Sequence, residues 1–458
     1  MHAPSARSRP RSRGPLCSPP FRMLLAGQSL SNIGNYVHTI AFPWLVLGPH
    51  EDVAMLGTVV AASGIATMAG IPLGGYLADR LGSWRVMLWS DCSQIVFATT
   101  LALMAYLLAP SLAWLLPLDV CAGFCGGLFI PSSMSVIPAL LPEDQIGRGV
   151  TIYSGGLQLV GVIGPALGGL TVALTGAPCA LAIDAGSYLA STLTLLGVRK
   201  FMTAAALSAS DEPDVTTEQT KTHAGAAPEV PFSVFAHRAR LLQVILGVAV
   251  VFYLAYPGVE EVAMPDLARR DFGASGYGTL LTVQALCALL GTMLAGKYAQ
   301  IKAVPYLQAA LIATFGIAVA LIPYAGGLPG ALVAMAVFSA AMSWQGIGII
   351  TIFQTWTPEH LLGRTMSVLM TVSQGLTQVS VIVFTVIIRH VGPAPTFLLA
   401  GSASVFTALA LVAFPTFRRY RLGDSFTMPQ LAANPPAATD EASNALVSPE
   451  SYAPGHER

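Results

Sequence analysis

Charged residues are scarce in this sequence, at only 10% of 458 residues. Soluble domains normally carry about 25%, whereas hydrophobic residues here reach 54% of the chain. The formal net charge is zero, so the chain lacks the basic character of a nucleic-acid-binding protein. The composition predicts a polytopic membrane protein whose partner is the lipid bilayer, with no nucleic-acid partner.

Cysteine is also sparse, and the six cysteines are scattered, mostly within apolar runs. No disulfide framework is therefore predicted. Cys121 and Cys125 have a spacing that suits half a metal site, but small buried core residues are the favoured interpretation, and no metal is predicted. No catalytic arrangement is apparent, because the histidines considered stand isolated: His38, His237, His360 and His390.

Apolar runs of about 20 residues, enough to cross a bilayer, recur along the chain. They predict an all-α polytopic fold of twelve transmembrane helices, in two six-helix halves separated by a polar, disordered linker. The predicted spans are 23–47, 54–78, 86–108, 112–137, 150–174, 179–198, 241–257, 276–297, 303–325, 328–352, 364–388 and 395–415. The predicted regions are an N-terminal tail (1–22), two halves (23–200 and 241–415), the linker (201–240) and a disordered C-terminal tail (416–458).

Lys and Arg collect on one side of these spans, and only Arg269, Arg270 and Arg389 fall on the other side. Positive residues favour the cytoplasmic side, so both termini are predicted to be cytoplasmic, in the cell membrane. An internal repeat supports two parallel halves, since residues 142–148 before span 5 resemble residues 358–364 before span 11.

A short turn between spans 2 and 3 carries Gly75, Asp79, Arg80, Gly82 and Arg85. It resembles the loop signature of the major facilitator superfamily of secondary transporters. That resemblance implies that Asp79 docks on the start of span 11, near Arg364, and latches the two halves together when the cytoplasmic side is closed. Asp91, one turn inside span 3, is assigned to the same charge cluster. For Asp79, the alternative is an acid in a loop exposed to solvent.

Span 5 contains a glycine motif in which Gly161, Gly164 and Gly168 share one helix face, followed by Gly169. Such a face permits close helix contact, and Pro165 permits a kink. The motif resembles the signature of the exporter, or antiporter, branch of the superfamily. Generic close packing is the alternative.

Polar residues inside the spans predict a cavity, because such residues normally face the bundle interior. Residues 21–34 are similar to macrolide-efflux-type and enterobactin-exporter-type members, although those relatives often carry Asp at the position of Asn35. Hydrogen bonding between helices is the alternative. The candidate substrate-contacting residues are Asn32, Asn35, His38, Gln158, Tyr253, Gln284, Gln345, Gln374 and Gln378.

Acidic residues at membrane depth are candidates for proton coupling, because loss of hydration favours the neutral form of a carboxyl group. Asp119 in span 4 and Asp184 in span 6 are the leading candidates, and Glu260 and Glu261 are secondary ones. A structural role is the alternative for each acid considered singly.

Together these features predict an exporter of a small hydrophobic or amphipathic compound (a drug, an antibiotic or a secreted metabolite such as a siderophore), working by proton antiport with alternating access. No cofactor is expected. A G-x-x-x-x-G-K string at 291–297 has Tyr298 where a phosphate-binding loop needs Ser or Thr, and no strand precedes it, so ATP is not expected. A monomer is expected. The alternatives are a major facilitator importer and a non-transporting membrane receptor or enzyme.

Overall fold

The computed structural model describes residues 14–48, 52–209, 240–295, 304–357 and 359–414. Every regular element in these ranges is helical, which confirms the all-α prediction. Helices suit a bilayer because each one satisfies its own backbone hydrogen bonds where no water is present.

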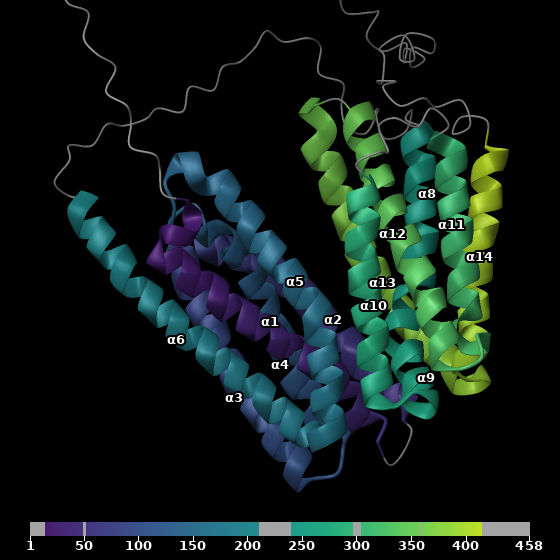
Figure 1. Ribbon diagram of the computed structural model, residues 1–458, viewed down its shortest axis with the longest axis horizontal. Coiled ribbons are helices and arrows are strands. Elements are labelled where there is room, and N and C mark those ends of the chain that lie inside the picture. The colour runs from purple at the N-terminus through teal and green to yellow at the C-terminus, as the bar shows by residue number, and fades with distance from the viewer. Residues whose placement is uncertain (1–13, 49–51, 210–239, 296–303, 358, 415–458) are drawn as a thin grey trace, which may run out of the picture.

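The first six long helices pack with one another, with α1 against α5 and α6, α2 against α4, and α3 against α4 and α6 (Figure 1). They are α1 (Pro19–Val46), α2 (Val53–Leu81), α3 (Ser83–Leu107), α4 (Leu112–Val136), α5 (Glu143–Thr175) and α6 (Ala177–Ala209). We call this bundle the first half.

The helices after residue 239 form a second bundle, the second half, in which α10 packs on α12, and α11 packs on α12 and α14 (Figure 1). Its α-helices are α8 (Arg240–Ala255), the short α9 (Met264–Asp271), α10 (Gly273–Ala295), α11 (Val304–Leu321), α12 (Leu328–Trp356), α13 (Glu359–Val391) and α14 (Pro393–Ala413). Its short elements are the π-helix η2 (Val259–Ala263) and η4 (Ile322–Tyr324), and one more, η1 (Pro15–Cys17), precedes α1 in the first half.

Eleven helices within the described ranges are long and apolar enough to cross a membrane, and one of them joins α8, η2 and α9 over Gln243–Asp271. The twelfth is α1, which is long enough at 28 residues but carries a polar stripe that includes Gln28, Asn32 and Asn35. The twelve-helix prediction is therefore confirmed.

Two predicted boundaries need correction. The linker was expected from residue 201, but α6 continues to Ala209, because the alanines after residue 203 are strong helix formers. Span 7 was expected to end at 257, but the helical path continues through η2 to Asp271. Residues 210–239 and both predicted tails up to 13 and from 415 lie outside the described residues.

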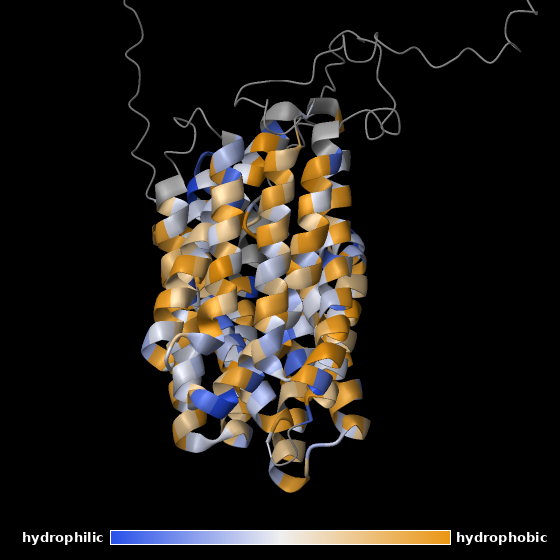
Figure 2. Cartoon of the chain, turned by 90° about the vertical axis from the view of Figure 1, so that its right-hand side faces the viewer, coloured by the Kyte–Doolittle hydropathy of each residue, from blue (hydrophilic) through white to orange (hydrophobic). Residues whose placement is uncertain are grey.

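The outward faces of the helices are apolar (Figure 2). Large hydrophobic side chains stand exposed there, including Leu174, Met293 and Phe406. Exposed apolar surface on this scale marks a contact with another apolar phase, and lipid is that phase for helices of this length.

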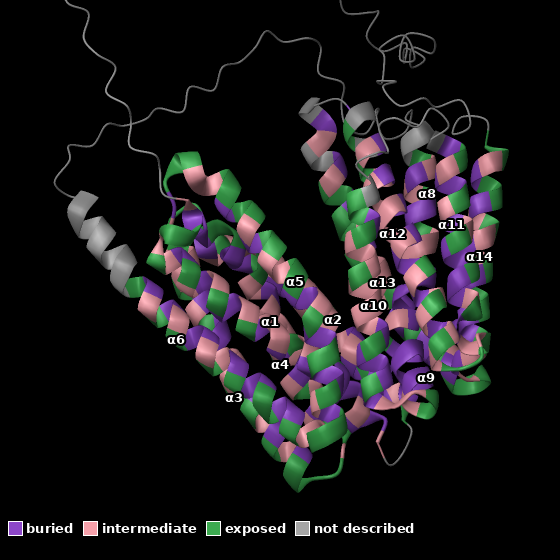
Figure 3. Cartoon of the chain, in the orientation of Figure 1, coloured by how far each residue is buried: buried purple, intermediate pink, exposed green. Residues whose placement is uncertain are grey.

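The two halves touch at one end of the molecule only among the described residues. We call this end the distal side, where α1 ends and α2 begins, and the opposite end, where α1 begins and α14 ends, the proximal side. The halves meet through α5 with α10 and α2 with α13, at distal residues such as Gly169 against Gly278 and Gly57 against Thr385. The ribbons diverge toward the proximal side, and buried residues are found at the distal contact as well as inside each half (Figure 3).

Candidate functional site

The turn that carries the superfamily signature is a single residue. Gly82 separates α2 from α3 and has a φ of +87°, a backbone conformation that glycine adopts without steric cost. Asp79 and Arg80 therefore lie in the last turn of α2, and Arg85 lies in the first turn of α3. The Arg80 guanidinium lies 4.7 Å from the centre of the Tyr76 ring, while Asp79 is exposed and has no hydrogen bond or ion pair within the described part of the chain.

The predicted docking point for Asp79 needs correction. Helix α13 begins at Glu359, so its free N–H groups belong to the turn before Arg364, because only the first turn leaves them unpaired. The side chain of Arg364 lies outside the described residues. The latch itself stays a prediction.

The motif on α5 has two contact faces. Gly161 and Gly164 lie against the Tyr36 ring of α1, and Gly168 lies against the backbone there. Gly169 faces the second half instead, where an added Cβ would lie 2.9 Å from the Cα of Gly278. The expected close helix contacts are present, and one of them joins the two halves.

A cavity of about 510 Å³ lies in the first half. Its lining comes from α1 to α6, and it includes the predicted residues Asn32, Asn35, His38, Asp119 and Asp184. Apolar and aromatic side chains such as Phe97, Phe129 and Tyr153 complete the wall. A mostly apolar cavity with a few polar groups is typical of a small-molecule site.

The other predicted lining residues lie elsewhere. Gln158 and Gln374 are exposed on their helices, and Tyr253 packs edge-on against Phe252. Gln284 donates to Glu260 Oε1 at 2.7 Å. Gln345 lines a much smaller pocket in the second half, and Gln378 lies beside Gly64 at the contact between halves. Their polarity inside apolar spans predicted a place in the bundle interior, but the sequence did not show which helix each residue would face.

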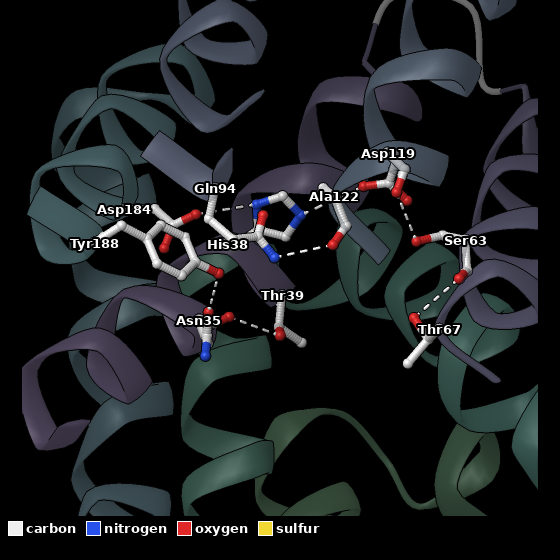
Figure 4. A network of polar contacts seen from close by, with 10 residues as sticks. All are labelled: Asn35, His38, Thr39, Ser63, Thr67, Gln94, Asp119, Ala122, Asp184 and Tyr188. Carbon is white, nitrogen blue, oxygen red and sulfur yellow. Dashed lines mark hydrogen bonds and ion pairs between the residues drawn. The ribbon is translucent and has the colours of Figure 1, made fainter. Parts of the chain in front are cut away.

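His38 stands between the two predicted proton-coupling acids (Figure 4). Its Nδ1 lies 3.3 Å from Asp184 Oδ2, and its Nε2 lies 3.9 Å from Asp119 Oδ1. We call these three residues the His38 cluster. Both acids are buried, and Asp184 Oδ1 has no hydrogen-bond donor among the described residues. The cluster thus holds one ionisable base between two acids.

Neighbouring polar groups hold the cluster in place (Figure 4). The Tyr188 hydroxyl donates to Asn35 Oδ1 at 2.7 Å, one helical turn from His38. The Ser63 hydroxyl donates to the backbone oxygen of Asp119 at 3.0 Å, and the His38 ring stacks on Phe42 at 5.5 Å. All three cluster residues were predicted from the sequence, but their pairing was not, because they come from three helices.

Asp91 also differs from expectation. It was assigned to the charge cluster of the α2–α3 turn, but it is buried at 2% exposure and lines the cavity. Its Oδ2 accepts a hydrogen bond of 2.6 Å from the Ser191 hydroxyl on α6. The reason is the orientation of α3 about its axis, which places Asp91 on the helix face that packs against α6.

Known proteins resemble most of the chain. The multidrug efflux pump Tap of Mycolicibacterium fortuitum is 25% identical over 420 residues, covering 90% of this chain and 98% of that protein. The Tap pump of Mycobacterium tuberculosis strain H37Rv is 23% identical, covering 88% and 95%. The enterobactin exporter EntS of Shigella boydii is 25% identical, covering 76% and 80%.

Solved structures share the fold. A peptide transporter POT in complex with sulfate aligns with a TM-score of 0.66 at 14% identity, covering 88% of this chain and 96% of that one. A D-xylose-proton symporter aligns with a TM-score of 0.61 at 15% identity, covering 90% and 98%. The family described as Major Facilitator Superfamily matches residues 24–377. The chain therefore belongs to the Major Facilitator Superfamily, a family of membrane transporters and not of enzymes.

Proposed function

We propose that this protein is a secondary exporter of small hydrophobic or amphipathic compounds, driven by proton antiport. The observation that carries the proposal is the His38 cluster, in which an imidazole lies between two buried carboxyl groups on the wall of a mostly apolar cavity. The names of the relatives, a multidrug efflux pump and an enterobactin exporter, support export as the direction of transport.

The chemistry suits exchange of a proton for a substrate. Ionisable groups buried in a membrane protein are costly and commonly mark proton pathways. Three interacting groups release and bind protons as a unit, so a substrate that enters the same cavity changes the proton affinity of all three. The transmembrane proton gradient supplies the energy, without ATP or another cofactor, and the monomer is the working unit.

The conformation supports alternating access by rocking of the halves. The halves are in contact on the distal side and diverge on the proximal side (Figure 1). In the proposed orientation the proximal side, with both termini, is cytoplasmic, and this conformation receives substrate from inside the cell. The exposed state of Asp79 agrees with a latch that is open in this conformation.

Inside-out vesicles energised with a proton gradient test the proposal. Antibiotics, dyes and siderophore-like compounds are added while a pH-sensitive dye reports the gradient. A transported compound is expected to release protons from the vesicles and to reverse the dye quenching. Asp119→Asn and Asp184→Asn should reduce this response at least about tenfold, as expected for loss of a proton-transfer group.

Asp144→Asn is the matched control, because Asp144 is an exposed acid at the start of α5 and should leave the response unchanged. If both cavity variants still show substrate-induced proton movement at the normal level, the cluster does not couple protons. If no compound moves protons while substrate still accumulates in vesicles, proton antiport is wrong.

A further inference from the structure

A chain of hydrogen bonds between three buried polar side chains lies between α1, α3 and α6, on the proximal side of the His38 cluster. The Gln28 amide donates to the Ser191 hydroxyl at 3.2 Å, and the Ser191 hydroxyl donates to Asp91 Oδ2 at 2.6 Å. All three residues are at most 2% exposed. The chain of hydrogen bonds therefore ends on a buried carboxylate that accepts a hydrogen bond from a hydroxyl group.

No cation balances Asp91 among the described residues, where its hydrogen-bond donor is the neutral Ser191. The other titratable groups that face it are phenols, Tyr153 of α5 and Tyr188 of α6. On α4, the backbone oxygen of Cys125 accepts a hydrogen bond from the hydroxyl group of Ser90, the residue before Asp91. An unpaired buried charge is costly, and binding a proton removes that charge.

Asp91 and the His38 cluster share one space. Asp91, His38, Asp119 and Asp184 all line the same cavity. Ser191 follows Asp184 by two turns of α6, so it lies on the same helix face about 10 Å nearer the proximal side. The cavity of about 510 Å³ has room for water between the two positions, where polar side chains from both offer hydrogen bonds. Asp91 therefore lies between the cluster and the proximal side of the molecule.

The Ser191 hydroxyl allows these hydrogen bonds to adopt two arrangements. With Asp91 ionised, hydrogen bonds run from Gln28 to Ser191 to Asp91, as found here. With Asp91 protonated, its own O–H donates to Ser191. The serine hydroxyl then donates to the Gln28 carbonyl oxygen after an amide flip, because a hydroxyl group both donates and accepts.

We propose that Asp91 is the proton-release station of this transporter, with Ser191 and Gln28 as positioning residues. The proposal rests on the proton coupling proposed above. A proton leaves the His38 cluster through cavity water and binds the Asp91 carboxylate, and the carboxyl group then loses it to water on the proximal side. No other bond forms or breaks.

The test separates net proton-driven transport from substrate exchange, which needs no proton release. Asp91→Asn is assayed in vesicles for proton-driven export, and separately for exchange of labelled against unlabelled substrate. We expect proton-driven export to fall at least about tenfold while exchange stays near the wild-type rate. Ser191→Ala keeps the acid and is expected to slow proton-driven export several-fold, again with exchange intact.

Ser132→Ala is the matched control, since Ser132 is equally buried and its hydroxyl bonds only Leu128 O of its own helix. Both activities should be unchanged in it. If Asp91→Asn does not reach the membrane, Ser191→Ala decides the question.

Each contrary outcome identifies what fails. Wild-type protein that moves no protons with substrate overturns the proposed function and this inference with it. Wild-type coupling that persists in Asp91→Asn and Ser191→Ala overturns only the release station. Equal loss of export and exchange in Ser191→Ala overturns it as well, because the residue then serves substrate binding or folding.

Discussion

One imidazole links the two acids of the cavity wall. His38 directs Nδ1 toward Asp184 and Nε2 toward Asp119, and its charge can change near neutral pH. A protonated ring donates from both nitrogens, whereas a neutral ring donates from one only. The three residues are therefore expected to act as one proton-binding unit.

Replacing His38 tests whether the three residues act as one unit. His38→Asn is expected to abolish most substrate-induced proton movement, because it removes the base between the acids. Adding Asp184→Asn should lower the response little further, since effects of residues that act together are strongly non-additive. Dye dequenching in vesicles measures all three variants. Losses that multiply in the double variant would show that the two residues act independently.

Helix α5 joins two parts of the molecule through its glycines. One face receives Tyr36 of α1 against Gly161 and Gly164, and another places Gly169 on Gly278 of α10. Backbones can approach this closely only where side chains are absent. The same helix thus packs within the first half and forms a main contact between the halves.

Identical substitutions on α5 test that second contact. Gly169→Ala would place its Cβ 2.7 Å from Ala274 O, so the backbone must shift, and overpacking typically costs about 1–3 kcal/mol. We expect a lower unfolding temperature and slower transport. Gly155→Ala is the matched control, because its Cβ meets nothing within 4 Å and should leave stability equal or higher. Equal behaviour of the two variants would contradict the role of Gly169.

Contacts on the distal side hold the whole molecule in the conformation observed. Arg269 Nη2 of the second half donates to Gly48 O at the end of α1, where a cation also complements the helix dipole. The Trp44 and Tyr277 rings stack across the same boundary at 5.5 Å. The proposed alternating access requires these contacts to break when the distal side opens.

Arg269→Ala is therefore expected to favour the state open on the distal side. A hydrogen bond to a charged group contributes about 1.5–3 kcal/mol, so the ratio of the two states should change about tenfold or more. Spin labels at Leu112 and Tyr324, on the distal ends of the two halves, report the distance by pulsed electron resonance. An unchanged distance distribution would rule out Arg269 as a distal clasp.

Asp79→Asn should move the same equilibrium in the opposite direction. The latch is predicted to act only when the proximal side is closed, so its loss favours the conformation described here, with the distal side closed. The same two labels should then show a narrower distribution at the shorter distance. A shift toward longer distances would contradict the latch.

The sequence by itself determined the class, the twelve helices and the family. Long apolar runs must form helices in lipid, and the glycine and charge motifs at 75–85 and 161–169 depend on short-range spacing. Composition and spacing also identified His38, Asp119 and Asp184 as polar residues at membrane depth.

Only the tertiary structure decided which of these residues meet. In the structure His38 contacts acids from α4 and α6. Asp91 lines the cavity instead of joining the charges at the turn, and Gln158 and Gln345 do not line that cavity. Spacing along one helix defines a polar face, but the rotation of that helix depends on side chains packed from distant parts of the chain. The pairing of charges across helices follows from that packing.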